Sequence, residues 1–165
     1  MAKRQVFFSF HYAKDVWRAA EVKNMGVVDN SSTWSANDWE EVRFKSDSKI
    51  KEWIDNQMAM RSCIVVLIGE ETSSRKWVKY EIEKAYELGK GIVGVYIHNL
   101  KDSDENQTVQ GANPFYSIYT SKGHRLSNYV ECYNPPHSSS ICVYDDIKKH
   151  LPDYIERAIS NKGKY

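Results

Sequence analysis

The sequence predicts an α/β fold in which helices cover both faces of a central, mostly parallel sheet, as a three-layer sandwich. Three short runs of β-branched and aromatic residues alternate with segments whose apolar residues recur at helical spacing. The runs are apolar on successive residues, which is typical of strands buried on both faces of a parallel sheet. The order strand, helix, strand, helix, strand is the one that right-handed crossovers produce in an open α/β sheet.

Three runs carry the strand pattern. The first is Val6–Phe10, read VFFSF, which lies between polar and charged flanks. The second is Cys63–Ile68, read CIVVLI and closed by Gly69, and the third is Ile92–Ile97, read IVGVYI. Tyr129–Tyr133 lies in a stretch that mixes aromatic residues with turn residues, and we treat it as a candidate for a fourth strand.

The first expected helix is Asp15–Met25, which follows the first strand. Asp15 can act as the N-cap or as an acid of the first turn, and Gly26 is a residue type that terminates helices. The face of this helix that would pack on the sheet is expected to consist of Val16, Ala19 or Ala20, and Lys23.

Three further segments have helical periodicity. Ser48–Met60 and Trp77–Leu88 each carry a stripe with a period near 3.6, and Gly89 stands where the second of these helices would stop. The tail from Asp145 onward has the same period, but Pro152 should break it or begin a second short helix. The two stripes expected to be buried are Ile50, Trp53, Ile54, Gln57 and Met58, and then Val78, Ile82, Ala85 and Tyr86.

Length and composition indicate one compact domain, because the chain has 165 residues of which 41% are hydrophobic. Its 23 Lys and Arg against 22 Asp and Glu leave it nearly neutral, so contact with nucleic acid or an anionic membrane is not indicated. No segment approaches the ~20 apolar residues of a membrane span, and the basic start lacks the apolar run of a secretory signal. We expect a cytoplasmic protein without nucleic-acid or membrane partners.

The cysteines do not form a disulfide or metal pattern. Cys63, Cys132 and Cys142 are an odd number without a CxxC pair, so reduced thiols are expected. A site built from Cys132, His137 and Cys142 would lack the ligand spacing of zinc modules. Neither of the glycine-rich phosphate loops, GxGxxG or GxxxxGKS/T, occurs in the sequence. We therefore expect no metal and no cofactor, and a dehydrogenase or P-loop enzyme is disfavoured.

In an open α/β sheet the ligand binds beyond the carboxyl ends of the strands. This rule selects three loops, which follow Phe10, Ile68 and Ile97. The helix expected after the second loop carries Trp77 and Glu81, which are four residues apart and therefore lie on one face. Glu81 would be a boundary residue whose carboxylate is partly removed from water, which is one way to prepare an acid for chemistry.

A structural role for Glu81 is the simpler alternative. An acid near a helix N-terminus complements the helix dipole, and Glu81 could pair with Lys84 or Lys79. The spacing alone does not choose between the two interpretations.

The opening stretch VFFSFHYAKD resembles the first box of TIR domains. That box is a strand followed by a serine, an aromatic residue and a downstream acid, which are Ser9, Phe10 and Asp15 here. The resemblance implies a flavodoxin-like TIR core over roughly residues 3–99.

A second motif lies on the expected helix around Glu81. Ser74, Trp77 and Glu81 resemble the TIR segment in which a serine and a tryptophan precede the glutamate used by NAD-cleaving members. Many TIR proteins carry a cysteine after the tryptophan, whereas this sequence has Val78, which should point into the core. The resemblance implies that Glu81 is the catalytic carboxylate.

More narrowly, the chain is similar to the bacterial TIR-like proteins of Thoeris anti-phage defence. The similarity rests on FFSFHY, DWEEVRFKSDSKIKEWI, VLIGEETSSRKWVKYEI and a later GANPF. In that family the TIR protein senses infection and converts NAD to a cyclic ADP-ribose isomer, which activates a separate NAD-degrading effector. The resemblance implies NAD as the substrate, an effector reached through a diffusible cyclic nucleotide, and a phage-derived trigger. It also implies a single TIR-like domain over residues 1–165, with a core at about 3–99 and a family-specific C-terminal extension at about 100–165.

The segment Val28–Val42 differs from the family pattern. It stands where TIR proteins have the mobile loop that covers the ligand and mediates assembly, and it fits a standard loop poorly. Self-association of this chain is therefore left open.

Cleavage of the bond between ribose and nicotinamide passes through an oxocarbenium-like state. The role implied for Glu81 is to place a negative charge near the developing positive charge and to hold the ribose hydroxyls. Cyclisation then requires that the substrate is folded and water is excluded. Phe10 and Trp77 are candidate aromatic walls for nicotinamide or adenine, and Ser9 and His11 are candidates to contact ribose or phosphate.

Three alternatives remain. A non-catalytic TIR-like signalling or scaffold module would act by self-association, with Glu81 as a surface charge. An N-glycosyl enzyme similar to nucleoside deoxyribosyltransferases would share the fold but release bases from nucleosides. A response-regulator-like switch ranks last, because no acidic pair follows the first strand and no aspartate ends the third. A cavity that holds Glu81 with Phe10 and Trp77 would favour the NAD enzyme, whereas a solvent-facing Glu81 paired with Lys84 would favour the module.

Overall fold

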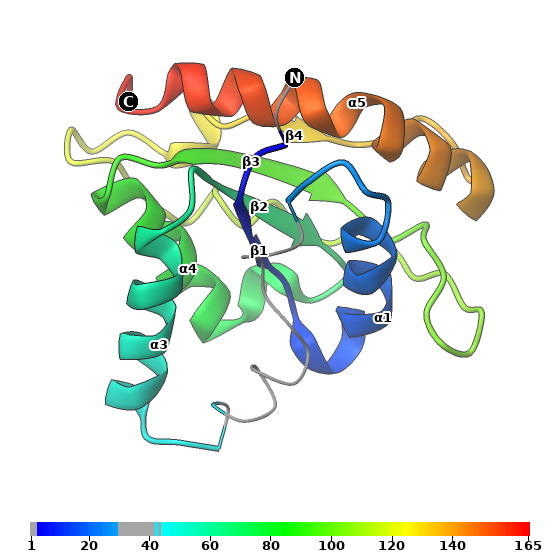
Figure 1. The fold of residues 1–165 in the computed structure, drawn as a ribbon, viewed down its shortest axis with the longest axis horizontal. Coiled ribbons are helices and arrows are strands. Elements are labelled where there is room, and N and C mark those ends of the chain that lie inside the picture. The colour runs from blue at the N-terminus through cyan, green and yellow to red at the C-terminus, as the bar shows by residue number, and fades with distance from the viewer. Residues whose placement is uncertain (1–2, 30–41, 43) are drawn as a thin grey trace.

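The computed structural model describes residues 3–29, 42 and 44–165. Figure 1 shows a central sheet with helices on both faces, as expected for the flavodoxin-like TIR fold. Most of the segment 28–42, on which the question of self-association rests, lies outside the described residues. The elements in chain order are β1 (Val6–Ser9), α1 (Tyr12–Lys23), α3 (Asp47–Ala59), β2 (Cys63–Ile68), the 3-10 helix η1 (Thr72–Ser74), α4 (Lys76–Glu87), β3 (Gly91–Tyr96), the 3-10 helix η2 (Leu126–Asn128), β4 (Cys132–Tyr133) and α5 (Ser140–Asn161).

The four strands run parallel in the spatial order β1-β2-β3-β4. Val6 pairs with Cys63, and Cys63 pairs with Gly91, so the first three strands start in register. The three strands expected from apolar runs are confirmed. The second matches residue for residue, and the other two differ by one residue at an end or at both ends.

The candidate strand Tyr129–Tyr133 is shorter than expected and is confined to Cys132 and Tyr133. The residues before it belong to the turn around η2, in which the Val130 N–H donates to the Leu126 carbonyl at 3.2 Å. Leu126 and Val130 are buried in the same core cluster. Because both side chains are anchored there, this part of the chain stays curled instead of extending along β3.

Alternate strand residues face opposite sides of the sheet and build two cores. Phe8 and Val65 pack with buried residues of α1 and α5 on one face. Phe7 and Ile64 pack with residues of α4 and the end of α3 on the other face. The helices α1 and α5 thus form one outer layer and α3 and α4 the second, which confirms the three-layer sandwich (Figure 1).

Helix α1 begins at Tyr12, three residues earlier than expected, and its buried face also differs from the expected one. Asp15 is an acid of the first turn, and it is buried together with Arg18 in an ion pair of 2.8 Å. Val22 takes the buried position that was assigned to Lys23. The periodicity did not predict that Asp15 and Arg18 are buried, and the mutual pairing of these two residues is what allows both to be inside the core.

Helix α5 is continuous through Pro152, contrary to the expected break, and it begins earlier than expected. A proline ring removes one intrahelical hydrogen bond and crowds the preceding turn. Val143, Ile147, Leu151 and Ile155 are all buried, on one stripe on both sides of the proline. Burial of this stripe against the sheet offsets the local loss, so the helix continues.

The chain between β3 and β4 crosses the carboxyl edge of the sheet and packs closely on the loop after β2. A Cβ built on Gly111 would overlap the carbonyl oxygen of Gly69 and crowd Glu70. The Thr108 hydroxyl donates to the Glu70 carboxylate, and the Thr108 N–H donates to the His98 carbonyl. The stretch GANPF, which begins at Gly111, is therefore fixed against the edge where the site is expected.

The structure also describes the state of the cysteines, the grouping of metal-ligating residue types and the apolar character of the helices. Cys63, Cys132 and Cys142 are free thiols. Within residues 3–29, 42 and 44–165, no group of three or more His, Cys, Asp and Glu is arranged to hold a metal ion. Among the helices described there, none has both the length and the apolar character needed to span a bilayer.

Substitution of Gly111→Ala should destabilise the fold, because the new methyl group meets backbone atoms of Gly69 that cannot move aside. Overpacking of this kind costs about 1–3 kcal/mol. For a chain of this length the melting temperature should fall by roughly 2–4 °C for each kcal/mol, measured by calorimetry. Ser117→Ala, at an exposed residue of the same segment, is the control and should leave the melting temperature unchanged. Equal melting temperatures for Gly111→Ala and the parent protein would contradict the close packing.

Candidate active site

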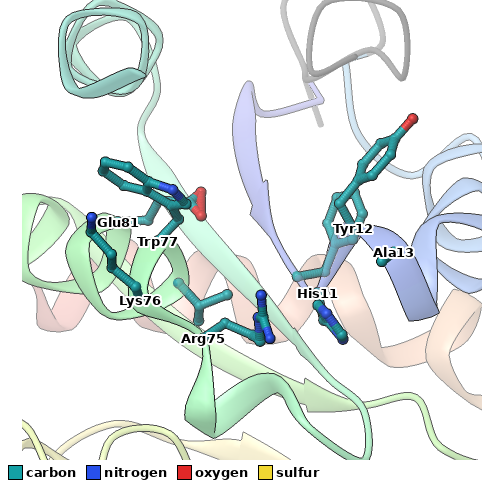
Figure 2. Close-up of a pocket in the computed structure, with 9 residues that line it drawn as sticks. His11, Tyr12, Ala13, Arg75, Lys76, Trp77 and Glu81 are labelled. Atoms are coloured by element: carbon teal, nitrogen blue, oxygen red, sulfur yellow. The ribbon is translucent and has the colours of Figure 1, made fainter. Parts of the chain in front are cut away.

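The candidate site is a cavity of about 300 Å³ at the carboxyl ends of β1 and β2. The helices that follow these adjacent strands leave in opposite directions, because α1 covers one face of the sheet and α4 the other. A crevice between two such loops is where open α/β sheets bind ligands. Figure 2 shows the residues that line the cavity, which are Phe10, His11, Tyr12, Ala13, Arg75, Lys76, Trp77, Val78 and Glu81.

Glu81 lies on the second turn of α4 with its carboxyl group at the cavity, and only 6% of its surface is exposed. Lys84, the partner considered for a surface role, instead lies near Asp55 at 3.8 Å and near Glu87 at 3.5 Å. Among the described residues, no cation forms an ion pair with Glu81. The carboxyl group is therefore buried without a balancing charge, which is not the arrangement of a solvated surface acid.

Ser9 forms a hydrogen bond with Glu81 but does not line the cavity. It is the last residue of β1 and is fully buried, and its hydroxyl donates to Oε1 of Glu81 at 3.3 Å. We expected Ser9 to contact ribose or phosphate, but in this structure its hydroxyl is directed to Glu81. The strand end and α4 are thereby joined at the carboxyl group itself.

Burial raises the pKa of Glu81 well above its ordinary value, and the hydrogen bond from Ser9 opposes this shift in part. The protonated form of Glu81 therefore persists to a higher pH than in a solvated glutamate. A shifted carboxyl group in a cavity is typical of catalytic sites, although structural groups can show such shifts as well.

Aromatic side chains stand on both sides of the cavity. Phe10 follows β1 and is largely buried, while Trp77 is half-buried in the first turn of α4. The Trp77 ring packs edge-on against Tyr80 at 5.9 Å between centroids, and the Lys76 ammonium group lies 4.7 Å from the Trp77 ring centroid. Figure 2 shows the Trp77 indole beside Glu81, as their spacing of four residues predicts.

His11 is the N-cap residue of α1, and it is 8% exposed although it lines the cavity. Its Nδ1 atom is buried and has no hydrogen-bond partner among the described residues. Burial lowers the pKa of the imidazole, and the nearby charge of Arg75 lowers it further. The His11 imidazole at the cavity thus stays unprotonated to a lower pH than a solvated histidine does.

The sequence did not identify Tyr12, Ala13, Arg75 or Lys76 as lining residues. They are neighbours in sequence of residues that were identified, and they belong to the starts of α1 and α4. They could have been predicted from the expectation that two helices begin at the same edge of the sheet, because helix N-termini at such an edge often bind ligands.

A buried ion pair fixes the base of α1 beside the cavity. Arg18 donates from Nε to the Leu100 carbonyl and from Nη2 to the Asn106 carbonyl, both at 2.8 Å, and pairs with Asp15 through Nη1. The Asp15 carboxylate lies so close to Gly69 that a Cβ there would overlap it. Burial raises the pKa of Asp15, and the Arg18 guanidinium opposes the shift. This pair therefore joins α1 to the loop after β3 by hydrogen bonds and packs against the loop after β2 at Gly69.

Two comparisons with known proteins bear on the site. The model of the family described as the Thoeris protein ThsB, TIR-like domain, matches residues 7–102. A curated protein of Bacillus cereus (strain MSX-D12) is 38% identical over 137 residues, which are 78% of this chain and 71% of that protein. It bears the name "Putative cyclic ADP-D-ribose synthase ThsB1". All residues that line the cavity lie within the range matched by the family model.

Substitution of Glu81→Gln should stabilise the protein, and more so at higher pH. Between the ordinary pKa of Glu81 in the unfolded chain and its raised pKa in the folded protein, the folded state binds the extra proton. The free energy of unfolding therefore falls as the pH rises through this range, and glutamine removes the effect. Calorimetry at pH 5 and pH 8 should show a gain in melting temperature that is larger at pH 8.

The matched control is Glu83→Gln, which removes an exposed acid from the same helix. It should show no gain that grows with pH. A Glu81→Gln variant that is no more stable than the parent protein at pH 8 would contradict the burial of an uncompensated carboxyl group.

Proposed function

The chain belongs to the Thoeris ThsB family of TIR-like proteins, and on this basis we propose that it cleaves NAD between ribose and nicotinamide and closes the remaining ADP-ribose into a cyclic isomer. The observation that carries the proposal is the buried Glu81 carboxyl group at a cavity between Phe10 and Trp77. The relative's name as a cyclic ADP-D-ribose synthase supports the same reaction class.

The bond that breaks joins the anomeric carbon of ribose to the pyridinium nitrogen of nicotinamide. The electron pair of this bond leaves with nicotinamide, which departs as a neutral molecule, so no general acid is needed. Positive charge develops on the ribose ring as in glycoside cleavage. An ionised Glu81 in a site with little water stabilises this charge more strongly than a solvated acid could.

The substrate itself promotes ionisation of Glu81. In the free protein burial favours the protonated carboxyl group, and no described cation balances its charge. The pyridinium of bound NAD brings a positive charge to the cavity and favours the carboxylate. The Ser9 hydroxyl stays in place as a donor to the ionised form. Ser9 is thus assigned a positioning role that acts through Glu81.

Cyclisation requires that a nucleophile of the same ADP-ribose reaches the anomeric carbon before water does. Phe10 and Trp77 provide apolar surfaces on both sides of the cavity, against which the nicotinamide and adenine rings can stack. Folding of the substrate between such walls favours the intramolecular reaction. The product would serve as the diffusible signal to a separate effector in anti-phage defence, in response to a phage-derived trigger.

The surroundings of Glu81 favour the enzyme over a scaffold module. A scaffold has no need to bury an uncompensated carboxyl group, and Glu81 is not paired with Lys84. An enzyme that releases bases from nucleosides could use the same carboxyl group for catalysis. Tests with different substrates must therefore separate this alternative from the NAD reaction.

Substitution of Glu81→Gln should reduce nicotinamide release from NAD by about 100-fold or more, as expected for loss of the main stabilising charge. Pure protein is incubated with NAD, in buffer and in lysate of phage-infected cells, and the products are separated by chromatography with mass detection. Nicotinamide and a product with the mass of cyclic ADP-ribose are expected, and Glu83→Gln should act like the parent protein. Equal turnover by the parent protein and Glu81→Gln would reject the catalytic role. Base release from deoxynucleosides without NAD turnover would favour the nucleoside enzyme.

The rate of NAD cleavage should rise with pH, because only the ionised form of Glu81 stabilises the transition state and burial raises its pKa. The kcat/KM for nicotinamide release should climb between pH 5 and pH 8. Ser9→Ala removes the hydrogen bond that favours the carboxylate, so the rise should shift to higher pH. A flat profile in the parent protein, or an unshifted one in Ser9→Ala, would contradict this role of Ser9.

A further inference from the structure

Two helices begin at the cavity, and both present their N-terminal turns to it. Tyr12 and Ala13 start α1, and Lys76 and Trp77 start α4, and all four line the cavity. Each helix has 12 residues, and neither has a side-chain hydrogen bond at its N-cap. The first-turn N–H groups and the positive ends of two helix dipoles thus lie at one cavity.

Arg75 adds a positive charge that forms no ion pair with a described residue. It is the N-cap residue of α4, it lines the cavity and it is exposed. Its guanidinium group makes no hydrogen bond or ion pair with any of the residues that the structure describes. Glu71 is near enough for the charge of Arg75 to lower its pKa, but its carboxylate pairs with Lys14 at 2.8 Å. Lys76, the other cation at the cavity, is engaged by Asp47.

His11 supplies a buried polar group across from Arg75. The imidazole is more than nine-tenths buried, and its Nδ1 atom has no hydrogen-bond partner in the described part of the chain. Figure 2 shows the Arg75 guanidinium reaching toward His11 and away from the Glu81 carboxyl group, which lies farther along the same α4 side of the cavity. A buried nitrogen without a partner is costly unless a ligand bonds to it.

We propose that Arg75, His11 and the N-terminal turns of α1 and α4 form a subsite for the diphosphate group of a dinucleotide. Guanidinium groups and helix N-termini are both suited to phosphate oxygens. The sequence has no glycine-rich phosphate loop, and in this subsite a side chain and two helix ends take its place. Arg75 is then the residue that selects NAD over a nucleoside that lacks phosphate.

The placement agrees with the covalent structure of the substrate. In NAD the diphosphate is attached to C5′ of the ribose whose C1′ carries nicotinamide, so the two groups lie on opposite sides of one sugar. Glu81 and Arg75 likewise lie at separate places along the lining of a single cavity (Figure 2). The choice of NAD rests on the proposed function, but binding of a diphosphate does not depend on catalysis.

The test compares two ligands that differ in the diphosphate. Binding of ADP-ribose and of nicotinamide riboside is measured by calorimetric titration with the parent protein, Arg75→Ala, Arg75→Lys and Lys79→Ala. Lys79 is an exposed cation on α4 outside the cavity, so it controls for net charge. Loss of a charged hydrogen bond should weaken ADP-ribose binding about 10-fold or more in Arg75→Ala and less in Arg75→Lys. Affinity for nicotinamide riboside should not change, and Lys79→Ala should bind both ligands as the parent does.

Three results would overturn the subsite. In the first, Arg75→Ala loses affinity for ADP-ribose and for nicotinamide riboside equally. In the second, Lys79→Ala loses as much affinity for ADP-ribose as Arg75→Ala does. In the third, Arg75→Ala binds ADP-ribose as tightly as the parent protein. Inorganic pyrophosphate should compete with ADP-ribose in the parent protein and lose this ability in Arg75→Ala. If NAD is never cleaved but these binding differences hold, the subsite stands and the proposed reaction fails. If NAD is cleaved and Arg75→Ala leaves both binding and KM unchanged, the reaction stands and the subsite fails.

Discussion

The arrangement of the whole site depends on keeping one carboxyl group, that of Glu81, away from water beside the Ser9 hydroxyl donor. Such burial is unfavourable for a charged group, so a fold would retain it only where something is gained. At this crevice Ser9 at the end of β1 and Glu81 on α4 are joined by a hydrogen bond, and no cation in the described part of the chain pairs with Glu81. Burial raises the pKa of the resulting group, and a cation that enters the cavity would favour its charged form.

Much of this arrangement could be predicted from the sequence, because it depends on local patterns. The apolar runs located the strands, and the spacing of Trp77 and Glu81 placed both on one face of α4. The rule that ligands bind at the carboxyl edge of the sheet then placed His11 and Glu81 near each other. Resemblance to TIR domains supplied the family, which the comparisons confirmed.

The parts that could not be predicted depend on contacts between distant segments. Arg18 is buried because carbonyl groups of Leu100 and Asn106, more than 80 positions away, accept its hydrogen bonds. Pro152 is tolerated because the stripe around it is covered by the sheet, which no local rule records. Arg75 likewise forms no ion pair with the described residues because Glu71, the nearby acid, is engaged by Lys14. In each case a partner that the local sequence does not reveal decides the outcome.

Helix α5 supplies five of the buried residues that cover one face of the sheet, yet it contributes nothing to the cavity. Every residue that lines the cavity lies before β3 in the chain. During synthesis these residues leave the ribosome first, while the face under α5 stays exposed until that helix emerges. A nascent chain would therefore contain the complete set of site residues before it could hold them in place. The proposed NAD-cleaving activity would thus appear only after α5 has left the ribosome.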